Sequence, residues 1–167
     1  PESRVVTPLT AEEQPVCIEA HEIDTVLPAT IGYPIPEFSL QNCETGEIVS
    51  VPEYGADAKG IWYIATAGWC PACRQHINNI FDNILSLFGP NDIRMMFVVT
   101  EDDNYEPADI GFCRSYARRY AADASLFYVD PNIQTTMENL WLYMGEDGTF
   151  GLPWNAIIEG GTNVLLH

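Results

Sequence analysis

The sequence predicts an α/β fold, and three observations lead to this prediction. Apolar runs typical of buried strands occur at residues 61–66, 93–100 and 126–129. Segments with the spacing of amphipathic helices separate them. A chain of 167 residues has the size of one domain and buries about 70% of its unfolded surface, enough for a sizeable core. Strands that alternate with helices require a mostly parallel sheet with helices on both faces.

The domain organisation follows from where this periodicity begins. Residues 1–15 mix Pro, Glu, Ser and Thr without a repeating apolar pattern, which predicts a flexible linker. Residues 16–167 are expected to form a single domain. Prolines and a glycine interrupt residues 16–36, which predicts an irregular covering segment. A short hairpin should follow, with strands at 38–40 and 47–51 around a glycine turn.

The remaining elements alternate along the chain. The run from Ile61 to Thr66 is apolar on both faces, as in a central strand that helices cover on both sides. A helix should run from about Cys70 to Phe88, because Gly89-Pro90 is a strong helix stop. After it the sequence predicts, in order, a strand at 93–100, a helix at 108–122, a strand at 126–129, a helix from 132 to about 143, and strands at 156–159 and 163–166.

Two cysteines lie in the first turn of the long helix. Four backbone N–H groups at a helix start lack partners within the helix, and the helix dipole adds partial positive charge. A thiolate on Cys70 is therefore stabilised, and Cys70 should be unusually reactive. With two residues between them, Cys73 lies close enough to resolve a mixed disulfide formed by Cys70. Pro71 fits a helix start, since the N–H that it lacks would have no partner there.

The Cys-Pro-Ala-Cys motif has two other interpretations. Half of a zinc site is one, but zinc needs two more ligands, and the sequence contains neither a second Cys-x-x-Cys nor a closely spaced His pair. A static disulfide is the other. Redox exchange is favoured over both, and no metal and no cofactor are expected.

The strand followed by Trp-Cys-x-x-Cys and a helix resembles the thioredoxin superfamily. Residues 36–46 resemble the Pro-x-Phe-x-Leu hairpin of its TlpA-like and ResA-like branch of extracytoplasmic thiol:disulfide oxidoreductases, which is related to the AhpC/TSA redoxins. Residues 151–158 resemble the segment that carries a cis-proline in this family. The resemblance implies a thioredoxin-like fold with a central mixed β-sheet flanked by helices, an N-terminal β-hairpin and a helix–strand insertion. The chain ends at His167, so the usual C-terminal helix is expected to be absent.

The same resemblance implies the residues of the active site. Cys70 would attack a substrate disulfide, and Cys73 would resolve the product. In the family, the tryptophan before the first cysteine and the residue before the cis-proline flank a groove for an extended peptide. These positions are Trp69 and Leu152 here, and the proline is Pro153. The implied partners are cysteine-containing protein substrates and a redox partner protein.

One position departs from the family. Thioredoxins carry a buried acid six residues before the first cysteine, whereas this chain has Ile64. Glu101, at the carboxyl end of the next strand, or a water is a candidate proton acceptor for Cys73, although a solvated loop carboxylate is the favoured interpretation of Glu101. Arg74 and His76 add positive charge near the helix start, and His76 is expected to lie on the solvated face.

The other cysteines are Cys17, Cys43 and Cys113. They allow three alternative disulfides, each of which leaves one free thiol. A bond between Cys17 and Cys43 is favoured, because the Cys17 segment leads into the hairpin of Cys43, and it would contribute on the order of 3 kcal/mol. Cys113 is expected to be a small buried hydrophobic residue. A structural bridge favours an oxidising compartment, so an extracytoplasmic protein is expected: periplasmic, secreted or anchored through a removed N-terminal segment.

The charge of the chain is strongly unbalanced, with 24 Asp and Glu against 7 Lys and Arg and a net charge of −17. This charge repels nucleic acid and anionic membrane surfaces, so neither is expected as a partner. No run of 18 apolar residues occurs, so this chain is not expected to insert into a membrane. Residues 1–16 lack the pattern of a signal peptide.

Two other functions remain open at this point. A thiol peroxidase of the peroxiredoxin type needs Thr or Ser three residues before its cysteine and Pro four further back, but these positions are Ala67 and Tyr63. A non-catalytic metal- or substrate-binding module is the second alternative. Copper carriers of this fold resemble Cys-x-x-x-Cys with a His, which differs from the spacing here, and a substrate-holding domain would keep its disulfide static.

Overall fold

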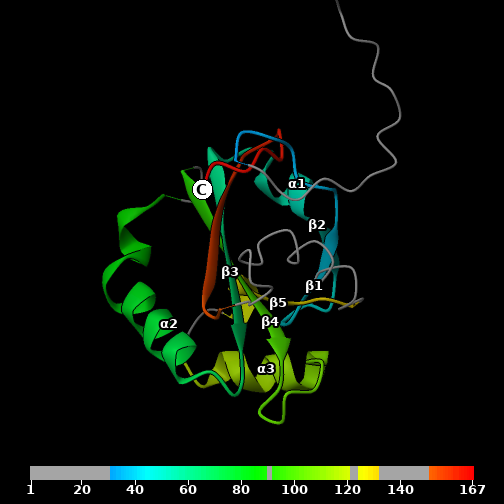
Figure 1. Ribbon diagram of the computed structural model, residues 1–167, viewed down its shortest axis with the longest axis vertical. Coiled ribbons are helices and arrows are strands. Elements are labelled where there is room, and N and C mark those ends of the chain that lie inside the picture. The colour runs from blue at the N-terminus through cyan, green and yellow to red at the C-terminus, as the bar shows by residue number, and fades with distance from the viewer. Residues whose placement is uncertain (1–30, 90–91, 121–123, 132–150) are drawn as a thin grey trace, which may run out of the picture.

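The described residues build one mixed β-sheet with helices packed against it (Figure 1). The computed structural model describes residues 31–89, 92–120, 124–131 and 151–167. The strands in this part of the chain are β1 (Ser39–Asn42), β2 (Ile48–Ser50), β3 (Gly60–Ala67), β4 (Ile93–Glu101), β5 (Phe127–Val129) and β6 (Trp154–Glu159). Their order in the sheet is β2-β1-β5-β4-β3-β6. The three central strands β5, β4 and β3 are parallel, whereas β1 and β6 pair antiparallel with β5 and β3.

Helices cover the sheet because the side chains of its strands alternate between two apolar faces. The α-helices of the described residues are α1 (Val51–Gly55), α2 (Pro71–Asn83) and α3 (Ile110–Arg118). Ile64 of β3 packs in one core cluster with buried residues of α2 and α3. Its neighbours Tyr63 and Ala65 belong to the cluster on the other face, together with Val51 of α1. The predicted α/β class, the mixed sheet, the hairpin β1–β2 and the insertion of α3 and β5 are thus confirmed.

Several element boundaries differ from the prediction. The long helix ends at Asn83, and a short 3₁₀ turn at Leu85–Leu87 carries the chain toward Gly89. Helix α1 begins where the second hairpin strand was expected to continue, because Pro52 near its start favours a helix over a strand. Residues 163–166 form isolated bridges instead of a regular strand. The predicted linker 1–15 and the helix from 132 lie outside the described residues.

The segment before β1 and the segment after β6 lie side by side at one end of the sheet. Pro34 and Val164 form an antiparallel bridge, and the N–H of Gly32 donates to the carbonyl of Leu165 at 2.8 Å. The amide of Asn163 donates to the carbonyl of Ile35 at 2.6 Å. These bonds join the segment before β1 to the segment after β6.

The structure corrects the predicted pairing of Cys17 with Cys43. Cys43 forms a disulfide with Cys113, with a Cα–Cα distance of 5.8 Å, and both residues are fully buried. The reason is topological. Strand β1 pairs with β5, and α3 packs on β5, so the residue that follows β1 lies beside α3 although 70 residues separate the two cysteines. Cys17 itself lies outside the described residues.

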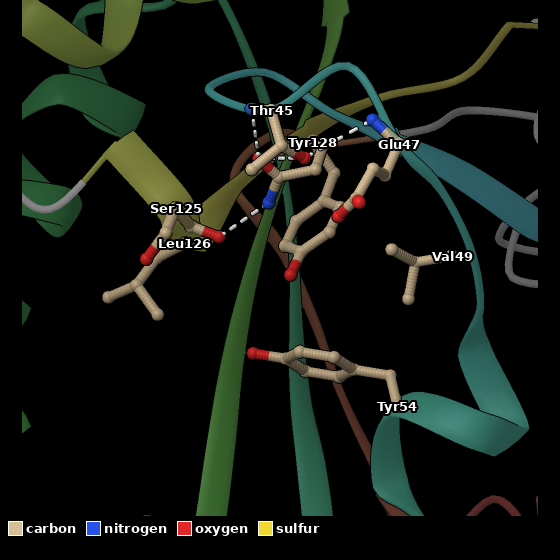
Figure 2. A pocket seen from close by; sticks show the side chains of 8 residues that line it. Thr45, Glu47, Val49, Tyr54, Ser125, Leu126 and Tyr128 are labelled. Carbon is tan, nitrogen blue, oxygen red and sulfur yellow. Dashed lines mark hydrogen bonds between the residues drawn. The ribbon is translucent and has the colours of Figure 1, made fainter.

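A second consequence of this topology is a pocket between the hairpin and the start of β5 (Figure 2). The side chain of Asn42 accepts hydrogen bonds from the N–H groups of Glu44 and Thr45 at 3.0 Å each, and it donates to the carbonyl of Ser125 at 2.7 Å. The hairpin turn is thereby fixed to the chain that enters β5. Neither of the cysteines of the Cys-x-x-Cys motif lines this pocket.

Candidate active site

The Cys-x-x-Cys motif lies at the carboxyl end of β3, where the chain turns into α2. Cys70 is the N-cap of α2 with extended backbone angles, and Pro71 occupies the first turn. The N–H of Cys73 donates to Sγ of Cys70 at 3.0 Å. This is the geometry of a side-chain N-cap, in which the sulfur takes the place that an oxygen usually fills. One of the N–H groups at the helix start, that of Cys73, is thus directed at the sulfur of Cys70.

Cys70 and Cys73 are joined by a disulfide, with a Cα–Cα distance of 5.3 Å. Both residues are buried, at 2% and 0% exposure. They form a small apolar cluster with Ala67, on which Trp69 and Leu152 pack. The Leu152–Pro153 peptide bond is cis, as expected. The structure therefore brings Cys70, Cys73, Trp69 and Leu152 together, from the turn after β3, from α2 and from the segment before β6, where Pro153 follows Leu152.

Glu101 has a role that the sequence did not reveal. Its carboxylate accepts a hydrogen bond from the indole Nε1 of Trp69 at 2.6 Å. The backbone carbonyl of Glu101 also accepts from the N–H of Gly68 at 2.9 Å. The favoured interpretation, a solvated loop carboxylate, is therefore wrong, since Glu101 holds the tryptophan next to the cysteines.

Tyr105 was not predicted as a site residue at all. Its ring stacks on that of Trp69, with centroids 4.8 Å apart and 22° between the planes. In the sequence only Glu101, at the carboxyl end of β4, pointed to this edge of the sheet, because loops at the carboxyl ends of parallel strands commonly build sites. Nothing in the spacing from Trp69 to Tyr105 indicates that the two rings meet.

The loop that carries Tyr105 is organised by one carboxylate. Oδ1 of Asp102 accepts hydrogen bonds from the N–H groups of Asn104 at 2.6 Å and Glu106 at 3.0 Å. The N–H of Asp102 in turn donates to the carbonyl of Glu106 at 2.8 Å. The backbone hydrogen bonds from Asn104 and Glu106 lower the pKa of Asp102 below the ordinary value of an aspartate. Next to it, Arg119 pairs with Asp103 at 2.9 Å and lowers the pKa of Asp103 as well.

The lowered pKa of Asp102 predicts how the protein responds to acid. A carboxylate whose folded pKa is depressed stabilises the fold above its unfolded pKa, and this contribution disappears as the pH falls through the folded pKa. The substitution Asp102→Asn should therefore lower the melting temperature at neutral pH and have a shrinking effect below the ordinary aspartate pKa. Melting curves of both proteins between neutral pH and pH 3 would check this. An effect of the same size at every pH would contradict the role of the charge.

His76 does not simply lie in solvent, as the sequence suggested. Its Nε2 is 3.0 Å from Oδ1 of Asn155 in β6, and Nε1 of Trp62 in β3 donates to the same oxygen at 3.0 Å. The amide oxygen is an acceptor, so His76 donates to it in the tautomer with the proton on Nε2. His76 therefore ties α2 to the sheet beside the site, whereas Arg74 is exposed.

No group of three or more His, Cys, Asp or Glu side chains in the described part of the chain is arranged to hold a metal ion. Within the same residues, every helix is too short or too polar to cross a membrane.

The fold and this site define the class of the protein: a protein of thioredoxin-like fold with a disulfide-bonded Cys-x-x-Cys motif and a cis-proline in the segment before β6. The chain belongs to the Redoxin family, whose model matches residues 30–153. A search of curated protein sequences finds no significant match.

Solved structures with this fold share little sequence with the chain. A putative thiol:disulfide interchange protein DsbE from Chlorobium tepidum is 19% identical, with a TM-score of 0.58 over 83% of each chain. The exposed lipoprotein thioredoxin of Streptococcus pneumoniae is 18% identical, with a TM-score of 0.52 over 79% of this chain and 87% of that one. A thioredoxin-like protein from Bacteroides caccae is 13% identical, with a TM-score of 0.61 over 83% of this chain. The match spans 45% of the Bacteroides caccae protein, less than half of its length.

Proposed function

We propose that this protein exchanges disulfides with protein substrates through Cys70 and Cys73. The observation that carries the proposal is the bond between these residues at the start of α2, with Sγ of Cys70 accepting the N–H of Cys73. In the reduced protein the same N–H and the helix dipole would favour a thiolate on Cys70. A thiolate is the reactive form of cysteine in disulfide exchange.

The exchange has two steps in the reducing direction. The Cys70 thiolate attacks one sulfur of the substrate disulfide, so that a bond forms between Cys70 and the substrate and the substrate disulfide breaks. The released substrate thiolate takes up a proton. Cys73, as a thiolate, then attacks Sγ of Cys70, closes the Cys70–Cys73 bond and releases the second substrate thiol. Two electrons and two protons pass to the substrate, and the oxidising direction is the reverse.

Trp69, Leu152 and Pro153 are proposed to form the groove that receives the substrate. Trp69 and Leu152 pack against the cysteine pair from different segments of the chain, which supports this role. An extended peptide between them would bring its sulfur to Cys70. The proposed partners are therefore cysteine-containing proteins and a second redox protein that restores the starting state.

An extracytoplasmic location is also proposed. The buried Cys43–Cys113 bond supports it, because structural disulfides persist in oxidising compartments. One structural neighbour is an exposed lipoprotein, which agrees with such a location.

A redox titration tests the proposed function. The protein is equilibrated in dithiothreitol or glutathione buffers, and free thiols are alkylated and counted by mass spectrometry. We expect Cys70 and Cys73 to titrate together as a two-electron couple between about −270 and −120 mV, the range of thioredoxin-like proteins. Cys43 and Cys113 should remain bonded in the folded protein, because both are fully buried.

The position of the midpoint assigns the direction of electron flow. A potential near the lower end of this range would make the protein a reductant, and one near the upper end an oxidant or isomerase. A Cys70–Cys73 bond that stays closed in all of these buffers would contradict the proposal and favour a static, substrate-holding module.

A further inference from the structure

Trp69 and Tyr105 together form an aromatic shelf beside the cysteine pair. Trp69 directly precedes Cys70 and packs on the cysteine cluster, and the ring of Tyr105 lies on Trp69. Tyr105 is 66% exposed although it is a large aromatic residue. The shelf therefore extends the apolar surface of the site outward, from the buried disulfide to solvent.

The backbone at Tyr105 is in a conformation that a tyrosine disfavours. Its φ is 66°, in the left-handed region, where the Cβ of a residue other than glycine is crowded. Asn and Asp tolerate this region better than aromatic residues do. The two hydrogen bonds that Asp102 accepts enclose this position and hold it in place.

The loop is also pressed against the backbone of the motif itself. A Cβ placed on Gly68 would lie 2.7 Å from an oxygen of Asp103 and 2.8 Å from the carbonyl carbon of Asp102. Only a glycine allows this approach, and the N–H of Gly68 bonds to Glu101 at 2.9 Å. The position of the Tyr105 ring is thus fixed relative to Cys70 by the loop on one side and by Trp69 on the other.

Stability of the core does not explain this arrangement. A side chain that remains 66% exposed buries little apolar surface, whereas its backbone conformation is unfavourable. An unfavourable conformation that keeps an exposed ring beside a reactive group indicates a functional role.

We propose that Tyr105 is a specificity-determining residue, which with Trp69 receives the part of the partner polypeptide next to its reacting cysteine. This inference rests on the proposed function. The residues beside the partner's cysteine lie about 3.3 Å apart along an extended chain, so they reach the shelf when the cysteine meets Cys70. A flat pair of rings suits an apolar or aromatic side chain. The carboxylates of the half-buried Asp102 and the exposed Glu106 disfavour an acidic side chain there.

Two substitutions at Tyr105 separate the ring from the backbone. Tyr105→Asn removes the ring but keeps a residue that tolerates a positive φ, so the loop should retain its shape. Tyr105→Phe keeps the ring and is the matched control. Each protein is mixed with insulin, a polypeptide disulfide, or with 2-hydroxyethyl disulfide, which is too small to reach the shelf. Dithiothreitol restores the Cys70/Cys73 dithiol after each turnover, and kcat/KM is measured for each substrate after the rate without protein is subtracted.

We expect Tyr105→Asn to lower kcat/KM for insulin about three- to tenfold, mostly through KM, because an aromatic contact contributes on that order. The value for 2-hydroxyethyl disulfide and the reduction potential of the Cys70/Cys73 couple should not change, and Tyr105→Phe should behave as the unchanged protein. Equal insulin rates in Tyr105→Asn and the unchanged protein would overturn the inference. So would an equal loss with both disulfides, since the residue would then act on the cysteines themselves.

The same experiment distinguishes a failure of the proposed function from a failure of the inference about Tyr105. If the unchanged protein reacts with neither insulin nor 2-hydroxyethyl disulfide, the exchange activity itself is refuted, and the inference about Tyr105 falls with it. If the unchanged protein reacts with both and Tyr105→Asn makes no difference, only the inference about Tyr105 is refuted.

Discussion

Replacing Cys70 by serine is expected to abolish disulfide exchange, with a loss of more than about a thousandfold in rate, because a serine hydroxyl at neutral pH is not an effective attacking group for a disulfide. Replacing Cys73 by serine should have a different result. Cys70 can still attack, but the mixed disulfide cannot be resolved within the molecule. The rate of reduction of insulin, followed by mass spectrometry of the protein, would measure both effects.

The trapped product distinguishes the roles of the two cysteines. The Cys73→Ser protein should accumulate a covalent adduct with glutathione after mixing with oxidised glutathione, whereas the Cys70→Ser protein should accumulate little. This difference is expected from the geometry, since Cys70 caps the helix and receives the N–H of Cys73. An adduct that forms mainly on Cys73 in the Cys70→Ser protein would reverse the assignment of attacking and resolving residues.

Loss of the Cys43–Cys113 disulfide is expected to be the most destabilising change outside the site. The two cysteines are 70 residues apart in the sequence. Closing a loop of this length removes entropy from the unfolded chain worth about 4 kcal/mol in the chain-entropy model. The double variant Cys43→Ala/Cys113→Ala should therefore unfold at a clearly lower urea concentration than the unchanged protein, with Cys70–Cys73 kept oxidised in both.

A matched control removes the other disulfide. Cys70→Ala/Cys73→Ala also deletes one bond, but its cysteines are only three residues apart, so the unfolded chain gains much less freedom. Its loss of stability should be distinctly smaller. Equal urea midpoints for the unchanged protein and the Cys43→Ala/Cys113→Ala variant would show that the long-range bond does not stabilise the fold.

The sequence predicts most of the fold because strand and helix patterns are local. The apolar runs of β3 and β4 lie on both faces of a covered sheet, and their periodicity is visible without any knowledge of tertiary contacts. Boundaries are harder to predict. Helix α1 has five residues and contains a proline, so no repeating pattern marks it. The end of α2 depends on packing, and the apolar residues after Asn83 continue the pattern without continuing the helix.

The disulfide pairing could not be predicted from patterns along the sequence. Neighbouring segments of the chain suggested Cys17 with Cys43, but the position of Cys43 is decided by the order of strands in the sheet. That order places β1 next to β5, on which α3 packs, so that Cys43 after β1 meets Cys113 of α3. A pattern along the chain does not contain this information, because it depends on a crossover between elements far apart in the sequence.

The residues of the candidate site also fall into two groups, those that the sequence predicts and those that only the structure shows. Cys70, Cys73, Trp69 and the cis-proline segment occur in motifs whose order is visible in the sequence. Glu101 and Tyr105 join the site only because the end of β4 lies next to the end of β3. Long-range contacts of this kind are set by parallel pairing.

The bridge between Pro34 and Val164 has a consequence for how this protein can be tethered. It lies near Gly60, where β3 begins, because Glu159 pairs with both Gly60 and the segment of Val164. The cysteine pair lies beyond the other end of β3, about 25 Å away for eight residues of strand. A lipid, a linker or a fluorescent label joined directly to Ile31 or His167 would therefore start from the end of the sheet opposite the cysteine pair (Figure 1).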